Sequence, residues 1–124
     1  VHLKAVGLSR QKIRYAKALA AADLDYIGLR KKDDDEVIKI LTEVPGIGVW
    51  TAEIYAMFSL KRADVFAAGD LALKESVRLL FSLDERPTES ELRVRAKKWS
   101  PWRSVAALLL WDYYGFIKKR EGVV

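Results

Sequence analysis

The stretch Pro-Gly-Ile-Gly at residues 45–48 constrains the fold of this chain more than any other feature. Before it, an amphipathic helix is predicted by four apolar residues at i, i+3, i+4 and i+7 spacing: Val37, Ile40, Leu41 and Val44. After it, a second apolar helical stretch covers residues 49–60. A turn needs only one glycine, so the second indicates that something approaches the main chain closely here. The pattern predicts a helical hairpin over about residues 36–60.

The rest of the chain also reads as helices, with no convincing alternating strand. Ser9 predicts the N-cap of a helix that ends near Ala22, and Thr88 predicts the N-cap of another that ends near Trp99. The acidic run at residues 33–36 predicts a helix start, where negative charge suits the helix dipole. Those carboxylates could alternatively bind a metal, although capping is the simpler interpretation.

Two further helices are expected in the second half of the chain. One has an apolar face made of Leu73, Val77, Leu80 and Phe81. The other starts at Ser100, because serine at the N-cap followed by proline at the first helical position is a strong start signal. This last helix is apolar nearly all round, so it is expected at the centre of the core. The chain is therefore expected to fold as one all-α unit.

Composition limits the classes of function. At 124 residues and 51% hydrophobic content the chain suits one globular domain, and no apolar run reaches the ~18 residues of a membrane span. The absence of cysteine excludes disulfides, thiolate zinc sites and cysteine-ligated iron–sulfur clusters, and it fits a reducing compartment. A net charge of +5 weakly favours a polyanionic partner.

The hairpin has a specific use in nucleic-acid binding. Its second helix starts at the glycines, so unpaired backbone N–H groups and the positive end of the helix dipole point outward together. With no side chains on Gly46 and Gly48, a DNA phosphate can reach these groups. Such a contact recognises the sugar–phosphate backbone and is independent of the base sequence. Together with the flanking apolar positions and the small Ala52, the pattern resembles the helix-hairpin-helix DNA-binding motif. The alternative is a plain helical hairpin with a glycine turn.

Asp70 ends the loop "DVFAAGD" and opens the helix "LALKESVRLLF". Taken alone, it reads as a helix cap. However, a hairpin followed about twenty residues later by such an aspartate resembles the helix-hairpin-helix base-excision DNA glycosylase superfamily. Within it, "PGIGVWTAEIYAMF", "ADVFAAGDLAL" and "SPWRSVAALLLW" together are similar to the 3-methyladenine DNA glycosylase II (AlkA-type) branch. This resemblance runs from about Leu8 to Tyr114.

The resemblance implies a fold, a domain assignment and an activity. The fold is the helical bundle of these glycosylases without its N-terminal helices. Residues 1–124 would form the C-terminal part of that domain, with the catalytic loop at residues 61–70. The activity is hydrolysis of the N-glycosidic bond of alkylated, 3-methyladenine-type bases in base-excision repair. Asp70 matches the catalytic aspartate, whose carboxylate would stabilise the oxocarbenium-like state and orient water. Trp50 stands where strand-cleaving relatives carry a Schiff-base lysine, so the enzyme is expected to be monofunctional.

The resemblance also implies the binding residues. An extruded base needs a stacking surface, and the expected pocket residues are Trp50, Ile54, Tyr55 and Trp102. Ile54 departs from the family, where a tyrosine can stand at this position. DNA contacts are expected from Gly46, Ile47, Gly48, Thr51 and Lys74. No cofactor is required, but a monovalent cation, Na⁺ or K⁺, would bind the main-chain carbonyls of Thr42, Val44 and Ile47.

The expected partner is double-stranded DNA with a damaged base, and no membrane partner is expected. The resemblance favours the cytoplasm, on bacterial nucleoid DNA. Helices of the resembled fold that this chain lacks would leave apolar faces in water, so association with a second copy, including by domain swapping, is expected. Two alternatives stay open, a non-catalytic helix-hairpin-helix DNA-binding module and a helical scaffold domain. Neither of them needs Asp70 or the tryptophans.

Overall fold

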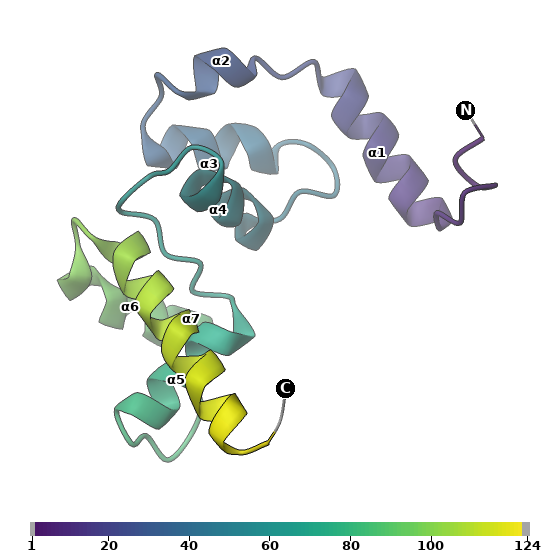
Figure 1. Cartoon of the computed structure of the whole chain (residues 1–124). Helices are drawn as coiled ribbons and strands as arrows, with labels where there is room; N and C mark the ends of the chain where they lie inside the picture. The colour runs from purple at the N-terminus through teal and green to yellow at the C-terminus, as the bar shows by residue number, and fades with distance from the viewer. Residues whose placement is uncertain (1, 123–124) are drawn as a thin grey trace. The chain divides into compact units, whose positions relative to one another are not determined.

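The computed structural model describes residues 2–122, which contain seven α-helices, one short 3₁₀-helix and no strand (Figure 1). In chain order the elements are α1 (Arg10–Ala22), α2 (Tyr26–Leu29), α3 (Asp34–Thr42), α4 (Val49–Phe58), α5 (Leu71–Leu80), α6 (Glu89–Ala96), η1 (Lys97–Trp99) and α7 (Arg103–Arg120). The all-α expectation is confirmed. Within residues 2–122, no helix is both long enough and apolar enough to cross a membrane.

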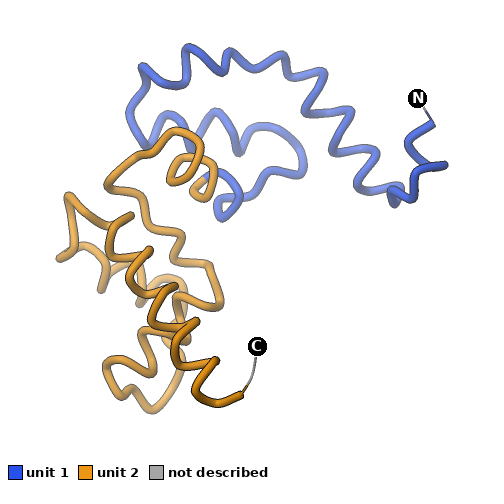
Figure 2. Tube along the Cα trace, viewed as in Figure 1, with its two compact units in different colours: residues 1–52 blue, residues 53–124 orange. Residues whose placement is uncertain are grey.

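The chain divides into two compact units, residues 1–52 and residues 53–124 (Figure 2). Each unit has its own buried apolar side chains. In the first unit these are Leu29, Val37, Leu41, Val44 and Ala52. In the second unit they include the loop before α5 and three helices, at Val65, Phe66, Ala67, Ala68, Leu73, Val77, Leu92, Ala107 and Leu110. The assignment of the whole chain to one part of a glycosylase domain stays a prediction.

Local side-chain caps start three of the helices as predicted. At the start of α1, Ser9 Oγ accepts a hydrogen bond from the Lys12 backbone N–H at 3.2 Å. At the start of α6, Thr88 Oγ1 accepts one from the Glu91 backbone N–H at 3.2 Å. Asp33 Oδ1 accepts from the Glu36 N–H at 2.8 Å, while the Glu36 side chain accepts from the Asp33 N–H at 3.3 Å, which completes a capping box. Capping therefore accounts for the acidic run, and the described part of the chain holds no cluster of three or more His, Cys, Asp or Glu residues suited to a metal.

Helices α5 and α7 pack against each other in the second unit. Ser76 Oγ on α5 donates to the Leu110 carbonyl on α7 at 2.8 Å. Two of the predicted apolar residues of α5 are fully buried, Leu73 and Val77. The prediction is wrong for Leu80 and Phe81, which are 48% and 42% exposed. The helix ends at Leu80, so Phe81 leaves the helical face and its ring lies 5.0 Å from the Arg95 guanidinium.

The predicted start of α7 at Ser100 is wrong, because α7 begins at Arg103. The Arg103 N–H donates to Asp64 Oδ1 at 3.2 Å. The Ser104 N–H donates to the Ala63 carbonyl at 2.9 Å. Ser100 Oγ donates to Asp64 Oδ2 at 2.7 Å instead of accepting a bond from the helix. The loop before α5, and not the adjacent serine, therefore satisfies the first N–H groups of α7.

The expectation that α7 lies at the centre of the core holds for only one side of the helix. One face is buried, at Ser104, Ala107 and Leu110. Four large apolar residues of the helix are exposed: Val105, Leu108, Leu109 and Phe116. Helix α7 therefore has one face in the core of its unit and apolar side chains outside it.

Candidate functional site

The hairpin turn of the first unit contains one glycine that the fold itself requires. Gly46 has a φ of +95°, a region that favours glycine. A Cβ added to Gly46 would lie 2.3 Å from Tyr15 Cγ, so the Tyr15 ring of α1 packs directly on the glycine. Sequence reasoning missed Tyr15, whose only signal is that it is the one aromatic residue in α1.

The second glycine is not required in the same way. Gly48 has no positive φ, and a Cβ added there would meet no atom within 4 Å. It directly precedes α4, and the first N–H groups of an α-helix lack intrahelical acceptors. Thr51, in the first turn of α4, is exposed. The Ile47 N–H already donates to the Val44 carbonyl at 3.0 Å. The open space beside Gly48 is what a phosphate would need, and the DNA contacts stay predictions.

The carbonyl groups predicted to bind a cation belong to the end of α3 and to the turn. Thr42 is the last residue of α3, at the negative end of the helix dipole, where carbonyls lack intrahelical donors. The Val44 carbonyl accepts from the Ile47 N–H, which uses one of its two lone pairs. Oxygen ligands of this kind suit hard cations. The residues therefore fit a cation, and the cation itself stays a prediction.

Asp70 is held at the start of α5 by two N–H bonds to one oxygen. Its Oδ1 accepts from the Leu73 backbone N–H at 3.0 Å, which caps the helix. The same Oδ1 accepts from Trp111 Nε1–H at 3.1 Å, and Trp111 lies 41 residues away on α7. The capping interpretation is therefore confirmed. A catalytic role is compatible with it and stays a prediction.

Trp111 is a second residue that sequence reasoning missed. It lies in the run "LLLWDYY", which reads as core. In the structure it is half-buried, and its ring centre lies 5.7 Å from that of Phe58. No spacing rule links Trp111 to Asp70, so only the packing of α7 against α5 reveals the pair.

The predicted pocket residues fall in both units. Trp50 belongs to the first, and the others belong to the second: Ile54, Tyr55 and Trp102. Trp50 and Trp102 are 47% and 61% exposed. Ile54 and Tyr55 are half-buried, as is Lys74 on α5. Trp102 directly precedes α7 and lies roughly 13 Å before Trp111 along the helix axis. The roles of these residues in binding stay predictions.

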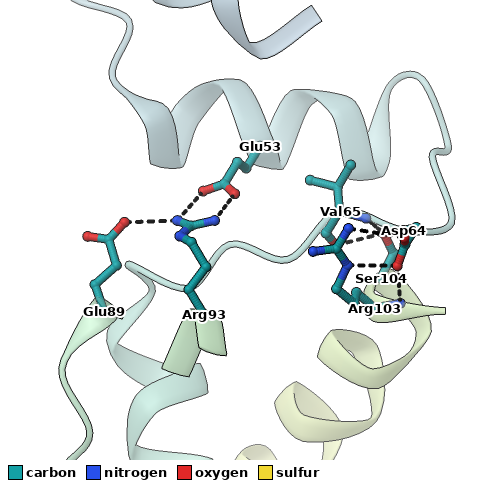
Figure 3. Close-up of polar contacts among 7 residues, drawn as sticks. All are labelled: Glu53, Asp64, Val65, Glu89, Arg93, Arg103 and Ser104. Carbon is teal, nitrogen blue, oxygen red and sulfur yellow. Dashed lines mark hydrogen bonds and ion pairs between the residues drawn. The ribbon is translucent and has the colours of Figure 1, made fainter. Parts of the chain in front are cut away.

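Ion pairs connect the elements around the loop before α5 (Figure 3). Arg93 on α6 donates to Glu53 on α4 at 2.8 Å and to Glu89 at 2.9 Å. Burial raises the pKa of Glu53 although Arg93 donates hydrogen bonds to it. The same bonds raise the pKa of Arg93. Desolvation of Glu53 therefore offsets part of the attraction between the two charges. Arg103 donates to both oxygens of Asp64, at 2.8 and 3.0 Å. This pairing holds the pKa of Asp64 at about 2, below its ordinary 3.8.

Ser104 joins the same loop to α7. Its Oγ accepts from the Val65 N–H at 2.9 Å and donates to the carbonyl of Arg62 or of Val65, at 2.6 and 2.8 Å. Val65 begins four consecutive buried residues that lead to Asp70. The predicted catalytic loop is thus fixed to the N-terminal end of α7.

Comparison with known proteins extends this description. Residues 1–101 match the HhH-GPD superfamily of base excision DNA repair proteins. DNA-3-methyladenine glycosylase 1 of Schizosaccharomyces pombe is 34% identical over 114 residues, which are 88% of this chain and 50% of that protein. A solved 3-methyladenine DNA glycosylase from the same yeast, in complex with abasic DNA, has a TM-score of 0.77 at 34% identity, over 89% of this chain and 56% of that one.

A solved DNA-3-methyladenine glycosidase from Bacillus halodurans has a TM-score of 0.80 at 35% identity, over 94% of this chain and 56% of that one. The chain therefore spans about half the length of these relatives. The resemblance noted from the sequence motifs is confirmed. The chain belongs to the HhH-GPD superfamily of base excision DNA repair proteins, and its homologues there include DNA-3-methyladenine glycosylases.

Proposed function

We propose that this chain carries the catalytic part of a monofunctional DNA glycosylase, which hydrolyses the N-glycosidic bond of alkylated, 3-methyladenine-type bases in base-excision repair. Its relatives are DNA-3-methyladenine glycosylases, of which the chain spans about half. The observation that carries the proposal is the double anchoring of Asp70, by the Leu73 N–H and by Trp111 Nε1–H. A cap alone requires only the first of these bonds.

In this mechanism Asp70 acts on the sugar. Breaking the N-glycosidic bond develops positive charge at C1′, and the base departs with the electron pair of that bond. A carboxylate fixed by two N–H bonds stabilises that charge with little reorganisation. It can also orient the attacking water and take its proton as the water oxygen bonds to C1′. Trp50 replaces the lysine of strand-cleaving relatives, so no covalent enzyme–sugar intermediate forms.

The partner in this proposal is damaged double-stranded DNA, and a related glycosylase has been solved in complex with abasic DNA. A phosphate would approach the N–H groups beside Gly48, where an added Cβ would meet no atom within 4 Å. Further contacts to the DNA would come from Gly46, Ile47, Thr51 and Lys74. A Na⁺ or K⁺ ion would be held by the carbonyls of Thr42, Val44 and Ile47. In a bacterial cell this partner would place the protein on the nucleoid.

Aromatic side chains would form the base pocket. Trp50 and Trp102 are 47% and 61% exposed, and an extruded base needs aromatic side chains on which it can stack. Alkylated purines such as 3-methyladenine are positively charged, and indole faces attract cations. Ile54 and Tyr55, both half-buried, would shape the range of accepted lesions.

We also propose that the chain associates with a second copy. Such a partner would cover the exposed apolar residues of α7: Leu108, Leu109 and Phe116. Sedimentation velocity measures this directly, and a monomer at every concentration tested would exclude it.

The release of free bases from methylated duplex DNA tests the enzyme. The parent is compared with Asp70→Asn, which we expect to lower the rate by ~10²–10³-fold. Asparagine caps helices about as well as aspartate, so Asp70→Asn should remain folded. Asp33→Asn is the matched control, because Asp33 caps α3 in the same way and should not affect release.

Three outcomes separate the candidate functions. Release by the parent and by Asp33→Asn, but not by Asp70→Asn, supports the glycosylase. Equal release by all three would remove Asp70 from the mechanism. No release by a parent that binds the DNA would leave the alternative, a non-catalytic helix-hairpin-helix binding module.

A further inference from the structure

One face of α1 carries only positive charge. Arg10, Arg14 and Lys17 stand at i, i+4 and i+7, which places them on one side of the helix. The residues of α1 include no aspartate or glutamate, and all three cationic residues are exposed. Among residues 2–122, no ion pair involves any of the three. This set of residues is the α1 cationic face.

The placement of these charges opposes the stability of the helix. Like charges at i and i+4, as at Arg10 and Arg14, repel by about 0.2–0.5 kcal/mol. Arg10 is also the first residue of α1, so it places positive charge at the positive end of the helix dipole. In an amphipathic helix the charged residues lie on the side opposite a buried apolar stripe. No residue of α1 is buried, so this arrangement does not explain its charges. A bound polyanion would relieve both unfavourable terms.

Helix α1 is attached to the hairpin turn within the first unit. The Tyr15 ring packs on Gly46, and the Arg14 guanidinium lies 5.2 Å from the centre of that ring. Gln11 donates to the Tyr15 hydroxyl at 2.8 Å, and this bond, followed by hydrogen bonding with Arg14, lowers the pKa of Tyr15. These contacts place Arg14 on the order of 10 Å from the turn, about one Debye length at 0.1 M salt. An anion bound at the turn would therefore experience the charge of Arg14.

We propose that the α1 cationic face is a second contact for the DNA backbone, beside the hairpin. The inference rests on the proposed DNA binding and adds a further part to that interface. From Arg10 to Lys17 the helix rises ~10 Å, which equals about three steps of 3.4 Å measured along the axis of a DNA duplex. Each guanidinium can bind a phosphate through two N–H bonds. Such contacts carry no sequence information and weaken as salt rises.

The test is the affinity of the full chain for a short fluorescein-labelled DNA duplex, measured by anisotropy from about 50 to about 200 mM KCl. The parent is compared with the triple variant Arg10→Gln, Arg14→Gln, Lys17→Gln. Glutamine has a similar helix propensity, which circular dichroism confirms for each sample. The control is Lys118→Gln, Lys119→Gln, Arg120→Gln, which removes the same number of charges from the end of α7. We expect the slope of log K against log salt to fall by about two to three in the α1 variant alone.

Each result decides the proposal. An unchanged slope in the α1 variant, with a parent that binds, would overturn it. An equal fall in both triple variants would also overturn it, because net charge alone would then explain the effect. If the α1 triple variant loses helix content, Lys17→Gln alone should lower the slope by about one, and no change would refute the contact. A parent without salt-dependent binding would overturn the proposed DNA binding as well, whereas base release by Asp70→Asn tests the chemistry separately.

Discussion

Replacing Ser104 with alanine tests how the predicted catalytic loop is held. The substitution removes an oxygen that accepts from the Val65 N–H at 2.9 Å and donates to the Arg62 or Val65 carbonyl. Val65 is 6% exposed and Ser104 is 7% exposed, so water does not readily replace the lost oxygen. We expect a lower free energy of unfolding, and a slower release of bases because the same loop leads to Asp70.

The magnitude follows from the groups left without partners. The buried Val65 N–H loses its acceptor, which costs about 1–3 kcal/mol. The single hydroxyl proton of Ser104 served one carbonyl at a time, and its net contribution is about 0.5–1.5 kcal/mol. Together these terms predict a loss of about 1.5–4.5 kcal/mol in the free energy of unfolding.

Ser76→Ala is the matched control. Ser76 is also a buried serine on a helix, but its hydroxyl only donates, at 2.8 Å, to the Leu110 carbonyl. That carbonyl lies inside α7, where carbonyls also accept the i+4 N–H, so it keeps a partner. We expect Ser76→Ala to cost about 1 kcal/mol or less.

Urea unfolding followed by circular dichroism measures both variants. The slope of the free energy against urea should stay unchanged, so that midpoints report stability. Equal costs for the two serines, or a cost for Ser104→Ala below about 0.5 kcal/mol, would refute the argument from the unpaired N–H.

Three further predictions use the same methods. Gly46→Ala should lower the free energy of unfolding by about 2–3 kcal/mol, because φ is +95° and the added Cβ would meet Tyr15. Gly48→Ala should change stability little and should lower DNA affinity. Similar urea midpoints for the two variants would contradict this prediction. The pKa of Asp64 is held at about 2, below its ordinary value of 3.8. The contribution of this carboxylate to the free energy of unfolding is therefore complete above pH 3.8 and is lost as the pH falls toward 2. In that range Asp64→Asn should lose less stability than the parent, and parallel curves of unfolding free energy against pH would exclude the effect. Trp111→Phe removes the indole N–H from the predicted catalytic aspartate, so kcat for base release should fall by about 10–10²-fold with KM nearly constant, and an unchanged kcat would show that the bond has no part in catalysis.

The predictions from sequence succeeded where one side chain and a nearby backbone group suffice. The caps at Ser9, Asp33, Asp70 and Thr88 each accept from an N–H three residues on, a distance fixed by helix geometry. The hairpin was found for the same reason, since its apolar spacing and glycine turn are local. The prediction that α7 starts at Ser100 was wrong although the serine–proline signal was strong. Asp64, more than thirty residues earlier in the chain, binds Ser100 and the Arg103 N–H.

The sequence by itself determined that the chain is helical, where most of its helices begin, and which motifs it shares with the HhH-GPD superfamily. Only the tertiary structure decided that Gly46 is required by Tyr15 while Gly48 is open, and that Trp111 holds Asp70. The physical reason is range. A cap or a turn is specified within one helical turn of chain, whereas these contacts join residues 31 and 41 positions apart and exist only once the elements pack.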